Sequence, residues 1–203
     1  MTRNHSHLVR RSWRSALAGV LLLVAAAFPG VAAAADPVTT AADAAVIGTV
    51  TPLCNGKAAT IVGQPGESAI RGTQGPDVIV ALEDGVRVDG RGGDDTICTA
   101  GGDNIINGGA GDDWINGGEG DNTIDGGSGN NTMSAGSGND TIIGGSGNDT
   151  VFAGDGDNLV SLQAGDDVIV TGNGSDRIDG AKGFDTCTPG GGLNYVGHCE
   201  VIL

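Results

Sequence analysis

The sequence predicts an all-β solenoid, a stack of short strands wound around a thin core. A motif of nine residues repeats without a break from residue 63 to residue 188, which gives fourteen windows. Glycine provides 39 of the 203 residues, about 19% against a typical ~7%, and aromatic residues only 3%. The chain therefore lacks the large side chains that fill an ordinary core. Units that cannot bury their own apolar residue must stack and share one core.

Each window divides into a turn and a short extended segment. The fourth residue is glycine in all windows but that of Asp84, and the sixth is Asp in eight windows and Asn in four. Glycine permits positive φ, and Asp and Asn tolerate tight turns. The last three residues alternate in direction, so one apolar side chain per window faces inward. The predicted core is the column of eighth residues: Ile70, Ile79, Val88, Ile97, Ile106, Ile115, Ile124, Met133, Ile142, Val151, Val160, Ile169, Ile178 and Cys187.

These windows resemble the RTX, or haemolysin-type, calcium-binding nonapeptide G-G-x-G-x-D-x-U-x. The windows that begin at Gly108, Gly117, Gly126 and Gly144 match its glycine frame fully, and the resemblance covers residues 63–188. It implies a right-handed parallel β-roll in which two windows make one coil. Fourteen windows then give about seven coils, with calcium between the turns of adjacent coils.

If successive windows alternate between two edges of the roll, the sixth residues form two columns, one much richer in aspartate than the other. Calcium prefers six to eight oxygen ligands. A site between windows n and n+2 would take one carboxylate from each, and backbone carbonyls of the turns would complete the shell. The candidate metal ligands are Asp77, Asp95, Asp113, Asp149, Asp167 and Asp185 in one column, Asp140 and Asp176 in the other, and the turn glycines Gly108, Gly111, Gly144 and Gly147.

The charge of each pair ranks these sites. Sites that involve Asn131 or Asn158 carry one charge fewer, and Asn104 with Asn122 carries none and suggests an asparagine ladder without metal. The alternative is that Asp and Asn only favour turns beside glycine. Carboxylates stacked in a column would then repel one another, so we expect calcium. The strongest sites are expected at Asp77/Asp95, Asp95/Asp113, Asp149/Asp167 and Asp167/Asp185.

The net charge of the chain limits the classes of partner that it can bind. The formal net charge is -15. The first 35 residues carry four arginines and no acid, so the remainder is more acidic still. Nucleic acid and anionic membrane both require a basic surface. We therefore expect cations as partners, with no nucleic acid and no membrane insertion.

The first 35 residues fit a secretory signal peptide, with arginines, an apolar run over 16–28 and small residues after it. The run is shorter than the ~20 residues of a membrane span. A buried core helix is the alternative, and Arg10-Arg11 leaves the twin-arginine route open beside the general one. RTX proteins usually leave through an exporter that reads a C-terminal signal, so an N-terminal signal puts that route in doubt. The expected organisation is signal peptide 1–35, linker 36–53, β-roll 54–188 and C-terminal cap 189–203.

All four cysteines follow the predicted signal peptide, and in an oxidising compartment they would form disulfides. Cys54 with Cys98 would staple the first coils, and Cys187 with Cys199 would close the terminal segment. Pairing Cys98 with Cys187 would span about five coils, roughly 24 Å, beyond disulfide reach unless a tail folds back. Free buried thiols are the remaining alternative.

The sequence thus predicts a secreted calcium-binding module, structural or interacting, that folds outside the cytoplasm as a monomer. The periplasm is the alternative compartment, and an extracellular partner stays unidentified. A surface-recognition array, adhesin-like or ice-binding-like, is a second reading. A non-catalytic accessory module of an extracellular enzyme is a third. The chain carries no nucleophile, zinc or phosphate-loop motif, so we do not expect an enzyme. The second reading rests on three Ser-x-Asn pairs: Ser128/Asn130, Ser137/Asn139 and Ser146/Asn148.

Overall fold

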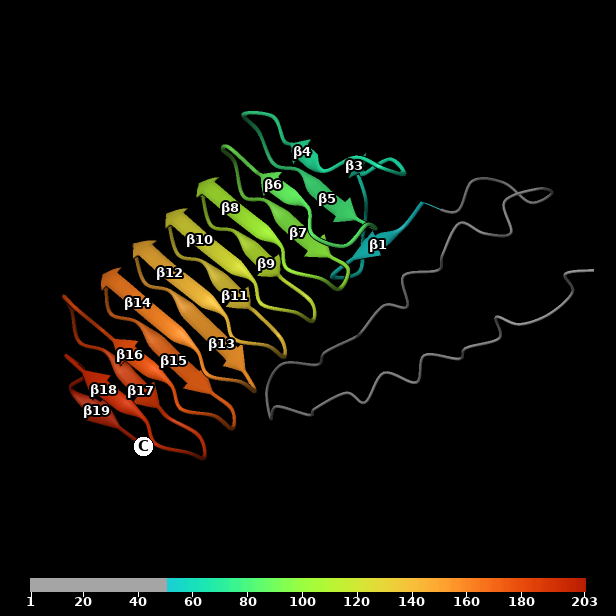
Figure 1. Ribbon diagram of the computed structural model, residues 1–203. Coiled ribbons are helices and arrows are strands. Elements are labelled where there is room, and N and C mark those ends of the chain that lie inside the picture. Colours follow the sequence, from blue (N-terminus) through green and yellow to red (C-terminus); the bar gives the residue numbers. More distant parts are fainter. Residues whose placement is uncertain (1–50) are drawn as a thin grey trace, which may run out of the picture. The chain divides into compact units, whose positions relative to one another are not determined.

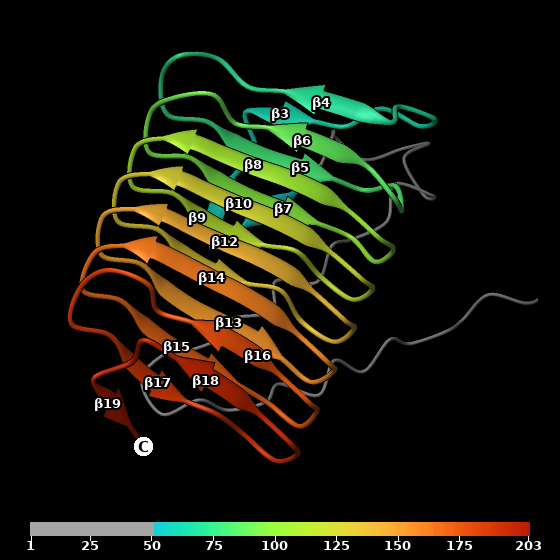
Figure 2. The ribbon, with the colours of Figure 1, turned by 60° about the vertical axis from the view of Figure 1, so that its left-hand side comes forward.

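The computed structural model describes residues 51–203, which form a β-roll of two parallel sheets (Figure 1). The chain passes from one sheet to the other and back, and the coils stack in chain order along the roll (Figure 2). The predicted all-β parallel β-roll is confirmed. Within residues 51–203 no helix could cross a membrane. The predicted signal peptide and residues 36–50 of the predicted linker lie outside the described residues.

The strands belong to three sheets. The eight-stranded sheet contains β4 (Ala69–Arg71), β6 (Arg87–Asp89), β8 (Ile105–Ala110), β10 (Thr123–Ser128), β12 (Thr141–Ser146), β14 (Leu159–Ala164), β16 (Arg177–Asp179) and β18 (Tyr195–Gly197). The nine-stranded sheet contains β3 (Ile61–Val62), β5 (Val78–Ala81), β7 (Thr96–Thr99), β9 (Trp114–Asn116), β11 (Thr132–Ser134), β13 (Thr150–Gly154), β15 (Val168–Thr171), β17 (Thr186–Thr188) and β19 (Val201–Ile202). An antiparallel hairpin joins β1 (Leu53–Cys54) to β2 (Lys57–Ala58).

The register of the sheets follows the repeat. Ile124 pairs with Ile106 on one side and with Ile142 on the other, and all three are eighth residues of their windows. Partners are eighteen residues apart, so two windows make one coil, as predicted. The roll has about eight turns, against the seven predicted, because β3, β18 and β19 extend the sheets beyond the fourteen windows.

The core is the predicted column of eighth residues, and all fourteen are buried. Side chains of an extended strand alternate between its two faces. The sixth residue and the first residue of the next window therefore share the inward side with the eighth, and Ala135, Ala153 and Leu162 are buried first residues. The same alternation buries every sixth residue except Ser68, and most of these are Asp or Asn at the margins of an apolar core.

Two disulfides join the flanking segments to the roll, with the predicted pairing. Cys54 is bonded to Cys98, with Cα atoms 5.8 Å apart, and ties the hairpin to β7. Lys57 Nζ also donates a hydrogen bond to Thr96 Oγ1 at 2.9 Å. Cys187 is bonded to Cys199, with Cα atoms 6.1 Å apart, and ties the last segment to the buried central residue of β17.

Candidate metal centre

The sixth residues form two hydrogen-bonded columns. In each, the backbone N–H of one residue donates to the side-chain oxygen of the residue eighteen positions later; Asp95 N, for example, donates to Asp113 Oδ1 at 2.8 Å. The bonds of the first, which we call the aspartate column, measure 2.7 to 3.0 Å and join Asp77, Asp95, Asp113, Asn131, Asp149, Asp167 and Asp185. Those of the second, the asparagine column, measure 2.8 to 3.0 Å and join Val86, Asn104, Asn122, Asp140, Asn158, Asp176 and Asn194.

The second carboxylate oxygen of most column aspartates has no partner. Each Oδ1 accepts the inter-coil hydrogen bond, whereas the Oδ2 is buried and unsatisfied. Buried polar groups are nearly always hydrogen-bonded, and an unsatisfied one is costly. A row of such oxygens therefore points to a missing positive charge or donor. The aspartates concerned are Asp95, Asp113, Asp149, Asp167 and Asp185 in the aspartate column and Asp140 and Asp176 in the asparagine column.

The asparagines show what these oxygens face. Asn104 Nδ2 donates to carbonyl oxygens of its own turn, among them that of Gly102 at 2.8 Å, and to that of Gly117 in the next coil at 3.1 Å. Asn122 Nδ2 makes the equivalent bonds to Gly120 at 2.9 Å and Ala135 at 3.2 Å. Where the sixth residue is aspartate, an oxygen replaces this donor and meets the equivalent carbonyls.

The surroundings of Gly108 and Gly126 show that the aspartate oxygen takes the position of the asparagine amide nitrogen. A methyl carbon built on Gly126 would lie 2.9 Å from Asn131 Nδ2 and 2.5 Å from the carbonyl oxygen of Gly144. The same carbon on Gly108, one coil earlier, would lie 2.5 Å from Asp113 Oδ2 and 2.7 Å from the carbonyl oxygen of Gly126. The amide nitrogen and the carboxylate oxygen thus occupy equivalent points.

Gly144 repeats the arrangement two coils further on. A methyl carbon there would lie 2.8 Å from both Asp149 Oδ2 and the carbonyl oxygen of Leu162. Two of the predicted site glycines, Gly108 and Gly144, therefore lie directly against a carboxylate and a carbonyl oxygen, with no room for a side chain.

The other two predicted site glycines, Gly111 and Gly147, shape the turn. Their φ angles are 130° and 111°, a region that favours glycine. A side chain on Gly111 would also collide with the backbone of Gly93 in the preceding coil. Each N–H instead donates to the following coil, that of Gly111 to the carbonyl oxygen of Ser128 at 2.8 Å. These glycines let adjacent turns approach closely enough for the carbonyls to reach the column.

Burial raises the pKa values of six column aspartates: Asp95, Asp113, Asp140, Asp149, Asp167 and Asp185. The pKa of Asp113 is raised to about 7, mainly by burial; the hydrogen bond from the Asp95 amide lowers it, and the carboxylates of Asp95, Asp94 and Asp112 raise it. Burial likewise raises the pKa values of Asp95, Asp140 and Asp167 to about 6. Such carboxylates hold a proton or a cation more readily than exposed ones.

Asp77 differs from the other candidates. Its Oδ2 accepts hydrogen bonds from Thr73 N at 2.7 Å and Thr73 Oγ1 at 2.9 Å, so this oxygen is satisfied within the protein. Nowhere in residues 51–203 do three acidic, histidine or cysteine side chains converge on one point. Any ion between coils would therefore depend on backbone carbonyls as well as carboxylates, as the sequence predicts.

The sites fit a hard divalent cation. The polar atoms that lie against Gly108 and Gly144 are oxygens, either of a carboxylate or of a peptide carbonyl, and calcium takes its ligands from these two classes. A cation there would satisfy the unpartnered Oδ2. Asparagine needs no ion because its amide already donates to such carbonyls.

Two members of the columns lie beyond the repeats and were not among the predicted site residues. Asn194 Oδ1 accepts a hydrogen bond from Asp176 N at 2.8 Å, and Glu200 Oε2 accepts one from Asp185 N at 2.7 Å. Asn194 stands eighteen residues after Asp176, so extending the column would have found it. Glu200 stands fifteen residues after Asp185, and no repeat spacing would have indicated it.

The fifth residues form a further set of bonds that the sequence reasoning missed. Here the later coil donates to the earlier one: Asp112 N donates to Asp94 Oδ1 at 2.9 Å, and Asn130 N donates to Asp112 Oδ1 at 2.7 Å. Two neighbouring positions of each turn thus bond the coils in opposite directions. These side chains are exposed.

The three Ser-x-Asn pairs do not form one outward row. Ser128 pairs with Ser146 in the eight-stranded sheet, whereas Ser137 pairs with Asp155. Asn130 and Asn139 also use their Oδ1 atoms to accept bonds from Asn148 N and Asp157 N. Their oxygens are occupied between coils, which does not favour a recognition array.

The fold and the columns define a parallel β-roll with oxygen-lined sites between its coils, which is the architecture of a calcium-binding structural module. The family model of the RTX calcium-binding nonapeptide repeat matches in four copies, over residues 71–106, 99–133, 125–160 and 159–187. These copies span more than half of the chain. The protein belongs to the RTX calcium-binding repeat family, and its repeats are calcium-binding motifs. No curated protein and no solved structure gives a significant match to the chain.

Proposed function

We propose that the protein is a secreted, non-catalytic β-roll that binds calcium between its coils and folds when it meets calcium outside the cytoplasm. It would then act as a structural or interaction module. The observation that carries this proposal is the row of seven buried aspartates whose Oδ2 atoms have no partner. A ligand that binds only the folded chain stabilises that state in proportion to the logarithm of its concentration. Calcium bound at the columns would therefore drive folding.

The columns suggest between which coils calcium binds best. We call the region between two successive members of one column a gap. Between Asp95 and Asp113, Asp149 and Asp167, or Asp167 and Asp185, two carboxylates and an unpartnered Oδ2 are present. We expect the highest affinities there, because affinity rises with the number of charged ligands. Gaps that combine one aspartate with Asn131 or Asn158 should bind more weakly.

Two gaps should differ from this pattern. We expect weaker binding between Asp77 and Asp95, because Thr73 already satisfies the Asp77 Oδ2. We expect no metal between Asn104 and Asn122, because the Asn104 amide donates to the surrounding carbonyls.

The disulfides and the composition of the chain both support secretion. Disulfides persist in oxidising compartments and are rare in the cytosol, and all four cysteines are paired. A glycine-rich acidic chain with little apolar surface tends to remain disordered without its ligand. Extracellular calcium modules work at ~10⁻⁴ to 10⁻³ M, so the roll would form after export rather than before it.

Circular dichroism of the purified, disulfide-intact protein tests the proposal. We expect a disordered spectrum in EDTA, a β spectrum in millimolar calcium, and several bound ions per chain by equilibrium dialysis. Magnesium at the same concentration is the control, because it demands a stricter octahedral shell. An unchanged spectrum after chelation, with no calcium retained on dialysis, would refute calcium-dependent folding. Sequencing the N-terminus of exported protein tests secretion, with cleavage expected after Ala33 to Ala35.

A further inference from the structure

The aspartate column does not end with the last repeat. Asp185 is its final aspartate, and Asp185 N donates to Glu200 Oε2 at 2.7 Å, as the earlier members donate to the next aspartate. The chain reaches this point by a shorter path, because Thr186 pairs with Val201, fifteen residues later. A glutamate is one methylene longer than an aspartate. The longer side chain therefore fills the place that a repeat aspartate would have filled.

The space beside Asp185 matches the repeat sites. Asp185 is 0% exposed, and its Oδ2 has no hydrogen-bond partner. A methyl carbon on Gly180 would lie 2.5 Å from this oxygen and would also meet the carbonyl oxygen of His198. His198 is eighteen residues after Gly180, as Gly126 is after Gly108. Its carbonyl thus takes the place of the glycine carbonyl at the repeat sites.

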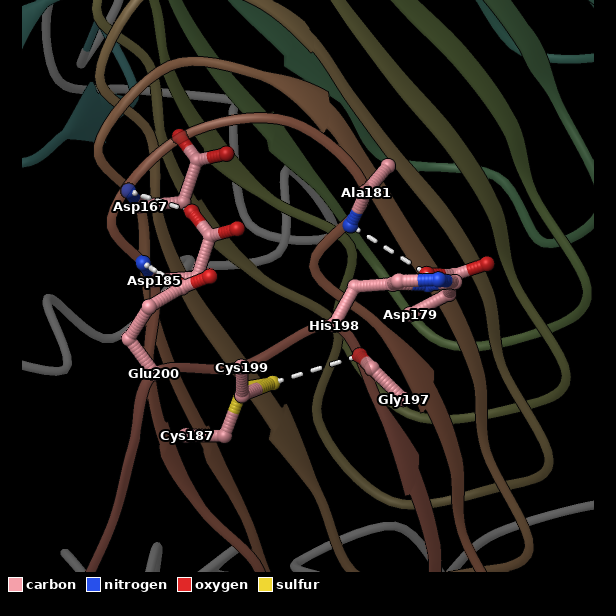
Figure 3. The surroundings of a disulfide bond; sticks show 9 residues. All are labelled: Asp167, Asp179, Ala181, Asp185, Cys187, Gly197, His198, Cys199 and Glu200. Atoms are coloured by element: carbon pink, nitrogen blue, oxygen red, sulfur yellow. Dashed lines mark hydrogen bonds and ion pairs between the residues drawn. A yellow bond between two sulfur atoms is a disulfide. The ribbon is translucent and has the colours of Figure 1, made fainter.

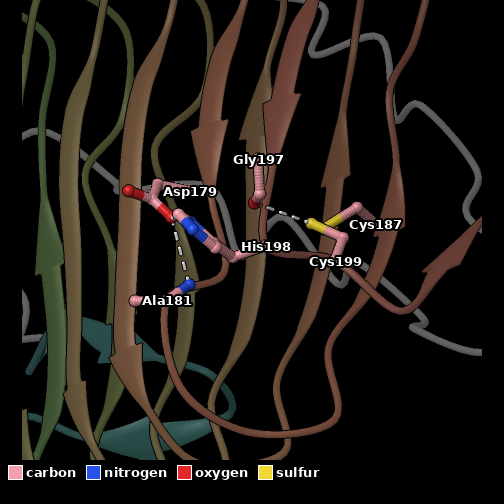
Figure 4. Close-up of polar contacts among 6 residues, drawn as sticks. All are labelled: Asp179, Ala181, Cys187, Gly197, His198 and Cys199. Carbon is pink, nitrogen blue, oxygen red and sulfur yellow. Dashed lines mark hydrogen bonds and ion pairs between the residues drawn. A yellow bond between two sulfur atoms is a disulfide. The ribbon is translucent and has the colours of Figure 1, made fainter.

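Two contacts hold the segment that supplies these oxygens (Figure 3). Cys199 lies between His198 and Glu200, and its disulfide anchors it to the buried Cys187 of β17. On the other side, His198 Nδ1 lies 2.7 Å from Asp179 Oδ1, which also accepts a hydrogen bond from Ala181 N at 3.2 Å (Figure 4). The His198 ring therefore points toward Asp179, while its carbonyl oxygen lies beside Gly180, as Asp185 Oδ2 does.

We propose that Asp185, Glu200 and the His198 carbonyl form an additional calcium site at the end of the roll, outside the nonapeptide pattern, which the Cys187–Cys199 disulfide holds in place. The proposal rests on the calcium-binding function proposed above. Glu200 supplies a second carboxylate and Asp185 the unpartnered one, so this site matches the charge of the best repeat sites. Glu200 is exposed, which gives an ion access from solvent.

Calcium counting by equilibrium dialysis at millimolar free calcium tests the site. We expect Glu200→Gln to lose one calcium ion per chain relative to the unaltered protein. Glutamine keeps an oxygen acceptor for the Asp185 amide, so only the charge is removed. Glu200→Asp should lose the same ion because the shorter side chain cannot bridge the fifteen-residue path. The matched control is Glu119→Gln, an exposed third residue of a repeat, which should retain every ion.

A double variant, Cys187→Ala with Cys199→Ser, tests the role of the disulfide. We expect the double variant to lose the same calcium ion as Glu200→Gln. A triple variant that combines these three substitutions should lose no further ion. Far-UV circular dichroism in calcium checks that each variant forms the roll. If a variant does not form the roll, the unaltered protein is titrated with calcium after selective reduction of the Cys187–Cys199 disulfide.

The outcomes separate the two proposals. If the unaltered protein binds no calcium, the proposed function fails. If it binds calcium and Glu200→Gln binds as many ions with the same affinities, the terminal site is refuted while the repeat sites stand. If the cysteine variant keeps the ion that depends on Glu200, the disulfide does not hold the site.

Discussion

The backbone amide of Asp113 donates to Oδ1 of Asn131 at 3.0 Å, and the two side chains, one coil apart, present opposite chemistry to equivalent carbonyls. Asn131 Nδ2 donates to the carbonyl oxygen of Gly129 at 3.2 Å, whereas Asp113 Oδ2 is buried without a partner. One column therefore contains a turn that is complete in itself beside turns that require an ion. This contrast leads to two reciprocal substitutions.

Asp113→Asn should stabilise the calcium-free roll and weaken its response to calcium. The new amide would donate to two carbonyls at about 1 kcal/mol each, and a buried charge would be removed. We expect about 1–2 kcal/mol more stability in urea unfolding with EDTA, in sucrose to favour the compact state. About one calcium ion should be lost. Glu119→Gln, at an exposed third position, is the control and should change neither quantity. Equal effects of the two substitutions would contradict this account.

Asn131→Asp should have the reverse effect. It would make the aspartate column unbroken from Asp77 to Asp185 and leave a further Oδ2 facing two carbonyls. We expect lower stability in EDTA by a similar ~1–2 kcal/mol and a steeper dependence of folding on calcium concentration, measured by circular dichroism. A variant that is more stable without calcium, or that gains no affinity for it, would be inconsistent with the oxygen-lined site.

The calcium-free roll should lose stability as pH rises from about 4 to 8. Burial raises the folded-state pKa of Asp113 to about 7 and that of Asp167 to about 6, above the ordinary value of 3.8. The folded chain therefore binds protons more tightly than the unfolded chain. Their contribution is complete below the unfolded pKa and is lost as pH rises through the folded pKa. Thermal melts in EDTA across this range, in sucrose to favour the compact state, check the sign.

In calcium the same carboxylates should make ion binding depend on pH. Protons and calcium compete for one set of oxygens, so the number of calcium ions bound per chain at a sub-saturating concentration should fall as pH falls from 8 to 5. Equilibrium dialysis at fixed pH measures it. Calcium binding independent of pH would show that the column aspartates are not the ligands.

Gly108→Ala should block a site without forcing an unfavourable φ. The φ of Gly108 is not positive, but the new methyl carbon would lie 2.5 Å from Asp113 Oδ2 and 2.7 Å from the carbonyl oxygen of Gly126. We expect the loss of about one calcium ion and a lower melting temperature in calcium. Gly101→Ala is the control, because its nearest neighbours, Asp84 Oδ1 and the carbonyl oxygen of Glu119, would be 3.8 and 3.9 Å away. If both variants bind calcium like the unaltered protein, the space is not the site.

Removing the Cys54–Cys98 disulfide should release the hairpin but preserve the roll. The bond closes a sequence separation of 44 residues, for which a loss of about 2–4 kcal/mol is typical. Hydrogen exchange of the Cys54→Ser, Cys98→Ser variant should accelerate over residues 51–62 and remain slow in β9 to β15. Uniform acceleration along the roll would mean that the hairpin nucleates or holds the whole stack.

The repeat made most of the fold predictable. A period of nine with one apolar residue in each window fixes which side chains face inward, and every predicted core residue from Ile70 to Cys187 is buried. The pairing of the cysteines followed from the same geometry, because stacked coils place distant windows beyond the reach of a disulfide. The segments beside the repeats were less predictable, and β3, β18 and β19 add to the coils counted from the sequence.

The chemistry of the site was predictable only in part. The columns and their unequal charge follow from spacing, but the direction of each hydrogen bond and the orientation of Asp113 Oδ2 depend on how adjacent turns approach. The hydrogen bond that Thr73 Oγ1 donates to Asp77 Oδ2 depends on one local side chain, which the repeat does not specify. Glu200 could not be found by period, because the chain shortens its path after residue 188 and a longer side chain restores the contact.

Because its coils are stacked, the roll is much shorter than the extended chain that it contains. One coil of eighteen residues adds about 5 Å to the stack, but the same segment pulled straight spans roughly 60 Å. Force applied to the two ends would therefore draw chain out one coil at a time. The coil that joins Asn104 to Asn122, with no ion to clamp that edge, should yield before those clamped at Asp149 and Asp167. Dissolved calcium would then set the tension at which the roll lengthens.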